Sequence, residues 1–238
     1  GGYFTSIQSR GLATGALRNR LARVGADGTL DTTFQVDAEG RPLVSLVQPD
    51  GKVIIGGSFT TVGGLTRNYL ARLNTDGSVD ASYAPAAPNG RVLSVVRQAD
   101  GKLIIAGTFT LIGTTARSYL ARLNTDGSLD TTYNTNPSGQ VGALALQSDG
   151  KVLIGGNFTS LNHIVTTITP GAAVGTTTAT TADGSATTTT TVSTSGGVTT
   201  TDKSTNYFRG YLARLNPDGS VDTFNPGASS TVSSIVLQ

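Results

Sequence analysis

The sequence lacks cysteine, methionine and tryptophan altogether. Without cysteine the chain has no disulfide, no thiolate nucleophile and no thiolate ligand for a metal ion. Because a translated chain starts with methionine, we expect that residue 1 is not the translation start and that a leader or a longer N-terminal region precedes it. No apolar run reaches the roughly 18 residues that indicate a membrane-spanning helix, so none is predicted.

Charge is also scarce, since only 13% of the residues are charged and the net charge is +2. The sequence pI near 9.0 reflects only this small excess. No run of Lys or Arg suits a phosphate backbone, so we predict no nucleic-acid partner. The 31 glycines, together with little Lys or Glu, favour short strands and tight turns over helix bundles.

The sequence contains one stretch that recurs four times with small changes. The copies are LARVGADGTLDTTF at 21–34, LARLNTDGSVDASY at 70–83, LARLNTDGSLDTTY at 120–133 and LARLNPDGSVDTF at 212–224. The arginine of the LAR triplet recurs at spacings of 49, 50 and 92 residues. The period is therefore near 50 residues, and the last spacing is 42 residues longer than the one before it. Self-similarity at such a period indicates a repeat architecture with one insertion. The predicted repeats span 1–40, 41–90, 91–139 and 140–228, a further repeat starts at 229–238, and the insertion covers 164–205.

Each repeat reads as four short strands. In LVSLVQPDGKVIIGGSFT (43–60), two β-rich runs flank Asp50-Gly51, which predicts a hairpin with a type I′ turn. YLARLN follows as a third strand, and a second Asp-Gly turn leads to a short fourth strand. The nearly continuous apolar runs KVIIGG, KLIIAG and KVLIGG are typical of strands covered on both faces. We therefore predict an all-β fold, a single β-propeller over 1–238 with four-stranded blades of about 50 residues and about four blades in view.

The segment QPDGKVIIGGSFTTVGGLTRNYLARLNTDGSVD (48–80) resembles the bacterial delta-60 repeat, a family assigned to β-propellers. The resemblance covers the whole chain apart from the insertion. It implies the propeller fold and implies no particular activity, because a fold does not fix a function.

Two sets of arginines recur with the repeats, Arg23, Arg72, Arg122 and Arg214 in the LAR triplets, and Arg18, Arg67, Arg117 and Arg209 five residues earlier. One interpretation is a ring of guanidiniums for an anionic glycan or phosphate. The other is that they bind carboxylates or turn carbonyls within the propeller, with Asp31, Asp80, Asp130 and Asp222 as partners. We favour the second, because blade packing must be solved in every repeat whereas a site is usually unique.

The N-x-D-G-x-x-D loops carry oxygen ligands, as in Asn74, Asp76 and Asp80. Three oxygens fall short of the six to eight that calcium prefers, and a self-capping turn explains the same residues. His163 is the only histidine, and we expect it on a loop with no nearby carboxylate. We assign no catalytic residue, no cofactor-binding residue and no metal ligand, and we expect no cofactor.

The insertion is rich in threonine, with 18 among the 40 residues 166–205. One interpretation is a disordered, O-glycosylated tract. The other is a protruding β-ribbon, which we favour because threonine is β-branched and the Thr runs lie symmetrically about Asp183-Gly184 and Gly196-Gly197. The chain also begins and ends in mid-repeat, so either 1–238 is a window on a longer propeller, which we favour, or the end blade borrows a strand.

These observations favour a non-enzymatic structural, adhesive or assembly module, exported by a bacterium to the cell surface or beyond, that self-associates into a fibre or surface layer. Its expected partners are copies of itself or other surface proteins. A propeller that binds a glycan or small ligand is the alternative, and a hydrolase or lyase is the third. Exposed aromatics would favour a lectin, but Phe4, Phe59, Phe109 and Phe158 recur with the repeats as core residues do.

Overall fold

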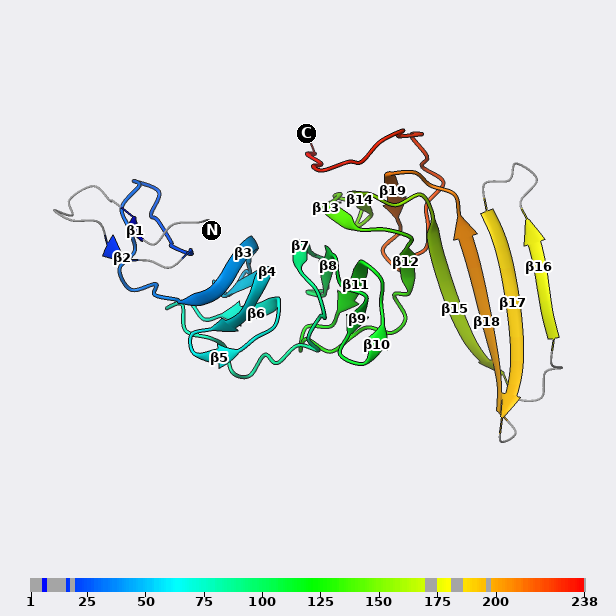
Figure 1. Ribbon diagram of the computed structural model, residues 1–238, viewed down its shortest axis with the longest axis horizontal. Coiled ribbons are helices and arrows are strands. Elements are labelled where there is room, and N and C mark those ends of the chain that lie inside the picture. Colours follow the sequence, from blue (N-terminus) through cyan, green and yellow to red (C-terminus); the bar gives the residue numbers. More distant parts are fainter. Residues whose placement is uncertain are drawn as a thin grey trace.

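The structure, a computed structural model, describes residues 6–7, 16–17, 20–169, 175–180, 186–195 and 198–237. All regular structure in these residues is β-strand, which confirms the all-β fold (Figure 1). The described part of the chain contains no helix able to cross a membrane.

The strands are β1 (Ser6–Ile7), β2 (Ala16–Leu17), β3 (Ala38–Val47), β4 (Val53–Val62), β5 (Leu65–Thr66), β6 (Leu70–Leu73), β7 (Val92–Arg97), β8 (Leu103–Gly107), β9 (Leu111–Ile112), β10 (Thr115–Ala116), β11 (Leu120–Leu123), β12 (Thr135–Pro137), β13 (Val141–Leu146), β14 (Val152–Gly156), β15 (Leu161–Thr169), β16 (Gly175–Thr180), β17 (Ala186–Ser195), β18 (Val198–Tyr207) and β19 (Leu212–Leu215).

The second, third and fourth repeats each build the same antiparallel sheet, and we call these sheets the second, third and fourth blades. The strand orders are β3-β4-β6, β7-β8-β11 and β13-β14-β19. The predicted runs KVIIGG, KLIIAG and KVLIGG form the central strands β4, β8 and β14, and every residue of β8 is buried. Two-sided burial of the middle strand explains why its sequence is apolar without alternation.

The fourth strand of each repeat is reduced to a single bridge, such as Leu73↔Val79 and Leu123↔Leu129. The cause lies just after it. In the second blade the amide of Ser82 donates to the Asp80 carboxylate and that of Tyr83 donates to the Asp80 carbonyl. Because these amides are used inside a turn, the chain leaves the sheet after one pair.

The Asp-Gly hairpins form where predicted, but the type I′ assignment is wrong. Gly51 N–H donates to the Gln48 carbonyl at 2.9 Å, Gln48 N–H donates to the Lys52 carbonyl at 2.8 Å, and φ is positive at Gly51 and not at Asp50. This is a type I turn with a G1 bulge, which needs positive φ at the glycine alone. The Asp50 side chain accepts the Lys52 amide and stabilises this turn.

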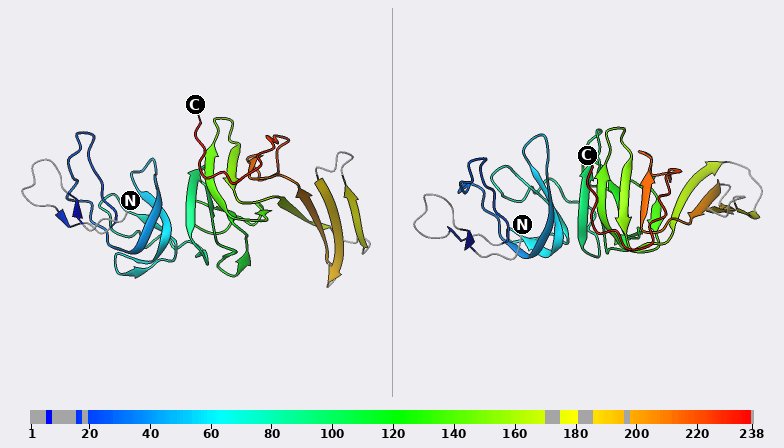
Figure 2. Two further views of the ribbon diagram at one scale, coloured as in Figure 1. Left: turned by 45° about the horizontal axis from the view of Figure 1, so that its top comes forward. Right: turned by 90° about the horizontal axis from the view of Figure 1, so that it is seen from above.

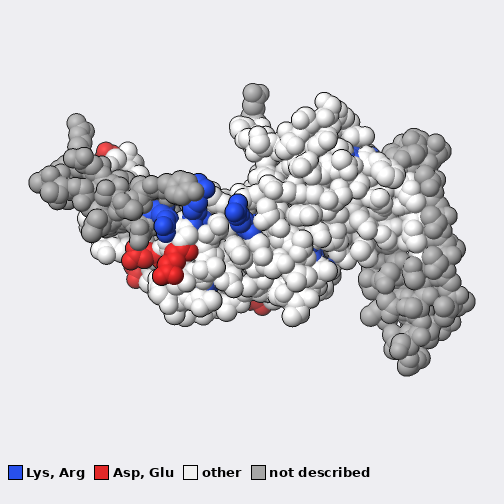
Figure 3. All heavy atoms as spheres, viewed as in Figure 1, with Lys and Arg blue, Asp and Glu red and all other residues white. Residues whose placement is uncertain are grey.

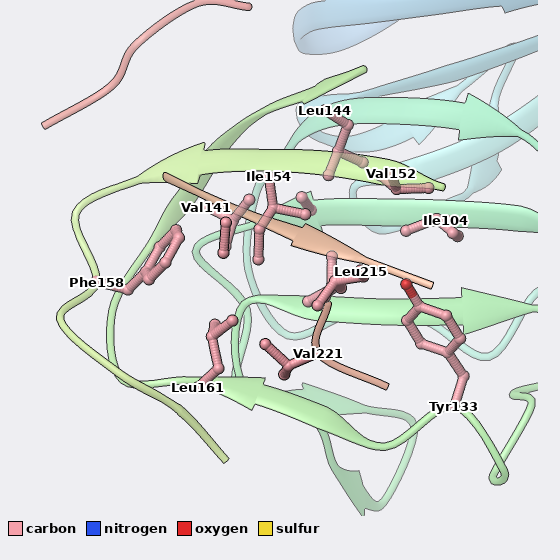
Figure 4. Close-up of a cluster of buried hydrophobic side chains, with 13 residues drawn as sticks. Ile104, Tyr133, Val141, Leu144, Val152, Ile154, Phe158, Leu161, Leu215 and Val221 are labelled. Carbon is pink, nitrogen blue, oxygen red and sulfur yellow. The ribbon is translucent and has the colours of Figure 1, made fainter. Parts of the chain in front are cut away.

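The blades stand side by side, with β3, β7 and β13 as neighbours (Figures 1 and 2). Side chains of the third and fourth blades share a core, and Figure 4 shows Ile104 together with Val141, Ile154 and Leu215. Glycine at position 56 lets strands of neighbouring blades approach closely, because a Cβ there would lie 2.7 Å from a methyl carbon of Val92. In the same way, a Cβ at Gly155 would lie 2.7 Å from a methyl group of Val232 in the C-terminal segment.

The described residues of the insertion form a β-ribbon, as predicted. Its strands β15, β18, β17 and β16 join the short β12 in a five-stranded sheet of order β12-β15-β18-β17-β16. Thr180 pairs with Thr187 across the segment that holds Asp183-Gly184, and Ser195 pairs with Val198 across Gly196-Gly197. The ribbon extends from the fourth blade at the end of the molecule opposite the first repeat (Figure 1).

Candidate functional site

The second, third and fourth repeats each hold an aspartate between a lysine and an arginine, which we call the Lys–Asp–Arg unit. In the second blade the Asp80 carboxylate accepts from Lys52 Nζ at 2.6 Å and from Arg72 Nε at 2.9 Å. Lys52 leads into β4 after its turn, and Arg72 lies on β6 opposite Ile54. The other units are Lys102–Asp130–Arg122 and Lys151–Asp222–Arg214, while Arg23–Asp31 forms the pair of the first repeat.

The surroundings of the unit keep the aspartate ionised. Burial alone would raise the pKa of Asp80, but hydrogen bonds from Lys52, Ser82 and Arg72 hold it well below its usual range. The guanidinium of Arg72 also lies 4.3 Å from the centre of the Tyr83 ring. Arg72 thus contacts Asp80 through Nε and Tyr83 through the face of its guanidinium.

The unit also joins neighbouring blades. Arg122 Nη1 donates to the Pro217 carbonyl at 2.6 Å, so the third blade binds the turn of the fourth. In that turn a Cβ at Gly219 would lie only 2.7 Å from the Tyr133 ring. Glycine is therefore needed for close approach as well as for its φ of 92°.

The second set of arginines binds carbonyl groups. Arg67 donates to the Thr66 carbonyl, Arg117 to those of Ala116 and Thr131, and Arg209 to that of Phe208. Arg18 lies outside the described residues. The described arginines of both sets thus bind carboxylates or carbonyl groups within the protein, as the structural interpretation predicts, while Nε of Arg67, Arg117 and Arg209 has no hydrogen-bond partner among the described residues.

Figure 3 shows charged side chains of both signs lying together over the early repeats. A polyanion-binding surface would carry a patch of positive charge alone. This face carries no patch of a single sign among the described residues.

The N-x-D-G-x-x-D loops are self-capped turns, which confirms that interpretation. Asp76 Oδ1 accepts from both the amide and the hydroxyl of Ser78, and Asn74 Nδ2 donates to the same hydroxyl at 2.9 Å. Backbone strain is repeated as well: φ is positive at Tyr69, Tyr119 and Tyr211, always the residue before the LAR triplet. Because every blade shows it, this strain marks the architecture and not a unique site.

His163 is where the fourth repeat departs from the others, and its predicted position on a loop is wrong. It lies on β15 and is 9% exposed, with Nδ1 3.1 Å from Thr135 Oγ1. Thr135 also donates a short hydrogen bond to the Gly219 carbonyl. Burial lowers the pKa of His163, and the charge of Asp218 opposes this effect. The prediction of no nearby carboxylate is therefore also wrong.

These contacts fix the base of the ribbon to the fourth blade. Leu161, the first residue of β15, is part of the core in Figure 4, and Ala186 at the start of β17 is buried. Ser204 on β18 donates to Asn162 on the neighbouring strand β15 at 2.6 Å. The ribbon is thus held in a defined direction at its base.

A second repeat-breaking feature is a hollow of about 520 Å³ beside the C-terminal segment. Its lining includes Gln140, Asn157, Thr231 and Ser233. Gln140 takes the place of Arg91 in the preceding repeat. The hollow is lined by uncharged polar groups, backbone and small apolar side chains.

Sequence reasoning missed the lysines of the units, although a DGK triplet precedes each central strand. It also missed the approach of Asp218 to His163, which are 55 residues apart, and no local signal marks it. Among the described residues no three of His, Asp and Glu gather as a metal-binding group.

The comparisons with known proteins agree with this geometry. No curated protein sequence matches the chain. The family model described as "Domain of unknown function (DUF5122) beta-propeller" matches residues 1–34, 48–83, 98–133, 147–165 and 197–224, which is more than half of the chain. Its segments follow the repeats and leave out most of the ribbon. The resemblance to delta-60 repeats is confirmed, and the chain belongs to this β-propeller family.

Proposed function

We propose that this protein is a non-enzymatic structural module, exported to the bacterial cell surface, that self-associates through its ribbon as part of a fibre or surface layer. The observation that carries the proposal is the open edge of the ribbon sheet: β16 is its end strand and pairs only with β17 among the described strands. An exposed strand edge presents unpaired amides and carbonyls that bind a further strand.

The use of the polar side chains supports a non-enzymatic role. The repeated aspartates and arginines bind one another and the neighbouring blade, as in the contact of Arg122 with Asp130 and Pro217. Their function in every repeat is then to hold the propeller together, which leaves the ribbon as the part that is specific to this chain.

The test compares the parent with a variant in which residues 165–203 are replaced by Asn-Gly. Ile164 pairs with Ser204, so a two-residue turn closes the shortened hairpin without moving the blade. We expect the parent to associate into dimers or larger particles in sedimentation velocity and electron microscopy, and the variant to form smaller species than the parent with an unchanged β-type circular dichroism spectrum. A variant that assembles as the parent does would refute the role of the ribbon. Cell fractionation of the source bacterium tests the surface location.

The hollow beside Gln140 supports a second candidate, a propeller that binds a neutral glycan or small ligand. Amide and hydroxyl groups suit sugar hydroxyls, but the described lining holds no aromatic ring on which a sugar would stack. Calorimetric titration of neutral oligosaccharides into the parent and a Gln140→Ala variant tests it, since specific binding should weaken in the variant.

A further inference from the structure

Among the described strands, β16 forms the outer edge of the ribbon and has a neighbour on one side only. β16 pairs with β17 in a continuous register from Gly175↔Val192 to Thr180↔Thr187, with no bulge. It ends the five-stranded sheet, and no other described strand lies beyond it. At the opposite end of the sheet, β12 covers the start of β15 and links the ribbon to the fourth blade.

The position of β16 leaves its edge accessible. In Figure 1 and in the right-hand view of Figure 2, β16 is the ribbon strand farthest from the blades. A second ribbon can therefore approach this edge without meeting the blades of the same chain. The edge of β15 lacks this freedom, because it faces the blades in Figure 1.

The edge strand also lacks the usual protection against pairing. Asp202 and Lys203 are the charged residues of the described ribbon, and both lie on the interior strand β18. β16 reads GTTTAT, with no charge and no proline. Natural sheets protect exposed edges with Lys, Pro or bulges, and β16 has none of these.

We infer that β16 pairs antiparallel with β16 of a second copy of this chain, joining two ribbons into one continuous sheet across a two-fold axis. The inference rests on the proposed self-association and names its contact. An edge that pairs with itself brings each residue next to its own copy or a near neighbour, so a charge there would repel its copy. The uncharged sequence of β16 is suited to this partner.

Symmetry fixes the register. Successive residues of a strand point to opposite faces of the sheet, and a two-fold axis normal to the sheet keeps each residue on its own face. Because residues that lie opposite each other share a face, the axis must place one residue opposite its own copy. For nearly full overlap of β16 that residue is Thr177 or Thr178. The contact closes after two copies, so a fibre or layer needs another contact elsewhere on the propeller.

The first test uses charge, with sedimentation equilibrium over a range of concentrations. The parent should dimerise, Thr178→Lys and Thr178→Glu should each weaken dimerisation about tenfold or more, and their mixture should form a heterodimer. Thr189→Lys and Thr189→Glu, on the interior strand β17 opposite Thr178, provide the matched control and should leave dimerisation unchanged.

The second test uses the absence of cysteine in the chain. Under mild oxidation, Thr177→Cys or Thr178→Cys should give a disulfide-linked dimer, whereas Thr189→Cys should not. The two copies of residue 189 would lie about 14 Å apart, three strand spacings, which is beyond disulfide reach.

The outcomes separate this inference from the proposed function. If the parent associates but Thr178→Lys and Thr178→Glu associate equally well and neither cysteine cross-links, another contact is used and the inference is wrong. If the parent is monomeric at every concentration, the proposed self-association fails as well.

Discussion

Replacing Arg122 by alanine tests whether the repeated arginines hold the propeller together. The Arg122 side chain is 9% exposed, and it donates to Asp130 at 2.9 Å and to the Pro217 carbonyl at 2.6 Å. Its guanidinium also lies 4.6 Å from the centre of the Tyr133 ring. Arg23 is the matched control, because it makes the equivalent pair with Asp31 and its side chain is 37% exposed.

The expected magnitudes differ because the environments differ. Removing one member of a buried ion pair costs about 3–5 kcal/mol, and Lys102 still neutralises Asp130, so we expect about 3 kcal/mol for Arg122→Ala. Loss of the hydrogen bond from Arg122 to the Pro217 carbonyl adds little, because Gln98 Nε2 still donates to this carbonyl at 3.3 Å. For Arg23→Ala, an exposed pair, we expect about 1 kcal/mol or less.

The assay is urea unfolding followed by circular dichroism, together with binding of the folded variants to an anionic polysaccharide. Arg122→Lys keeps the charge but not the forked geometry, so its stability should lie between those of the parent and the alanine variant. The reasoning is refuted if Arg122→Ala unfolds like the parent but loses binding to the polysaccharide, because the arginines would then form an anion site.

Three further predictions concern stability. Gly219→Ala should lower the free energy of unfolding by about 2–5 kcal/mol, because strain at positive φ adds to the clash with Tyr133. Gly28→Ala, which has open space around it, should lower this free energy by about 1–2 kcal/mol. Equal losses for the two variants in urea unfolding would contradict the packing of Gly219 against Tyr133. Tyr133→Phe should leave stability unchanged or raise it by about 1 kcal/mol, since the buried hydroxyl has no hydrogen-bond partner among the described residues and Phe stands at this position in two repeats; a loss above about 1 kcal/mol would indicate a bound water. Because burial lowers the pKa of His163, the unfolded state binds the proton more readily, so stability should fall as the pH drops below about 6.5, and His163→Gln should abolish this first fall. The repeated aspartates have lowered pKa values, so their contribution is present above about pH 4 and is lost below it in both proteins, which thermal melts across pH will show.

The sequence predicted the fold well wherever the signal was local. The Asp-Gly turns and the apolar central strands depend on neighbouring residues, and both appear at the expected positions. The turn type was wrong because it was inferred from the residue pair alone. In the structure the Asp50 carboxylate binds the Lys52 amide, which favours a loop with positive φ at the glycine only.

Contacts between distant segments were predictable only when they repeated. The pairing of Arg72 with Asp80 was expected because the two residues recur together in every copy. The contact of His163 with Thr135 occurs once and joins residues of two repeats, so no repeated sequence pattern predicted it. A unique contact of this kind follows from the arrangement of the whole fold, which a single sequence does not display.

The ribbon shows how a repeat can carry a long insertion without losing its blade. From Phe158 to Arg214 the chain takes 56 steps, against 13 from Phe59 to Arg72. The strands around it nevertheless pair in the same register, with Gly155 opposite Leu212 where the second blade has Gly56 opposite Leu70.

The energetic reason is that closing a longer loop costs little. Two doublings of loop length cost only about 1.2 kcal/mol of closure entropy. Pairing of β12 with β15, the buried Leu161 and the contact of His163 with Thr135 offset this cost at the base of the ribbon. Because the base is stabilised by the blade, the free edge at β16 does not have to stabilise the fold. Its uncharged sequence can therefore change to suit a partner strand while the propeller remains intact.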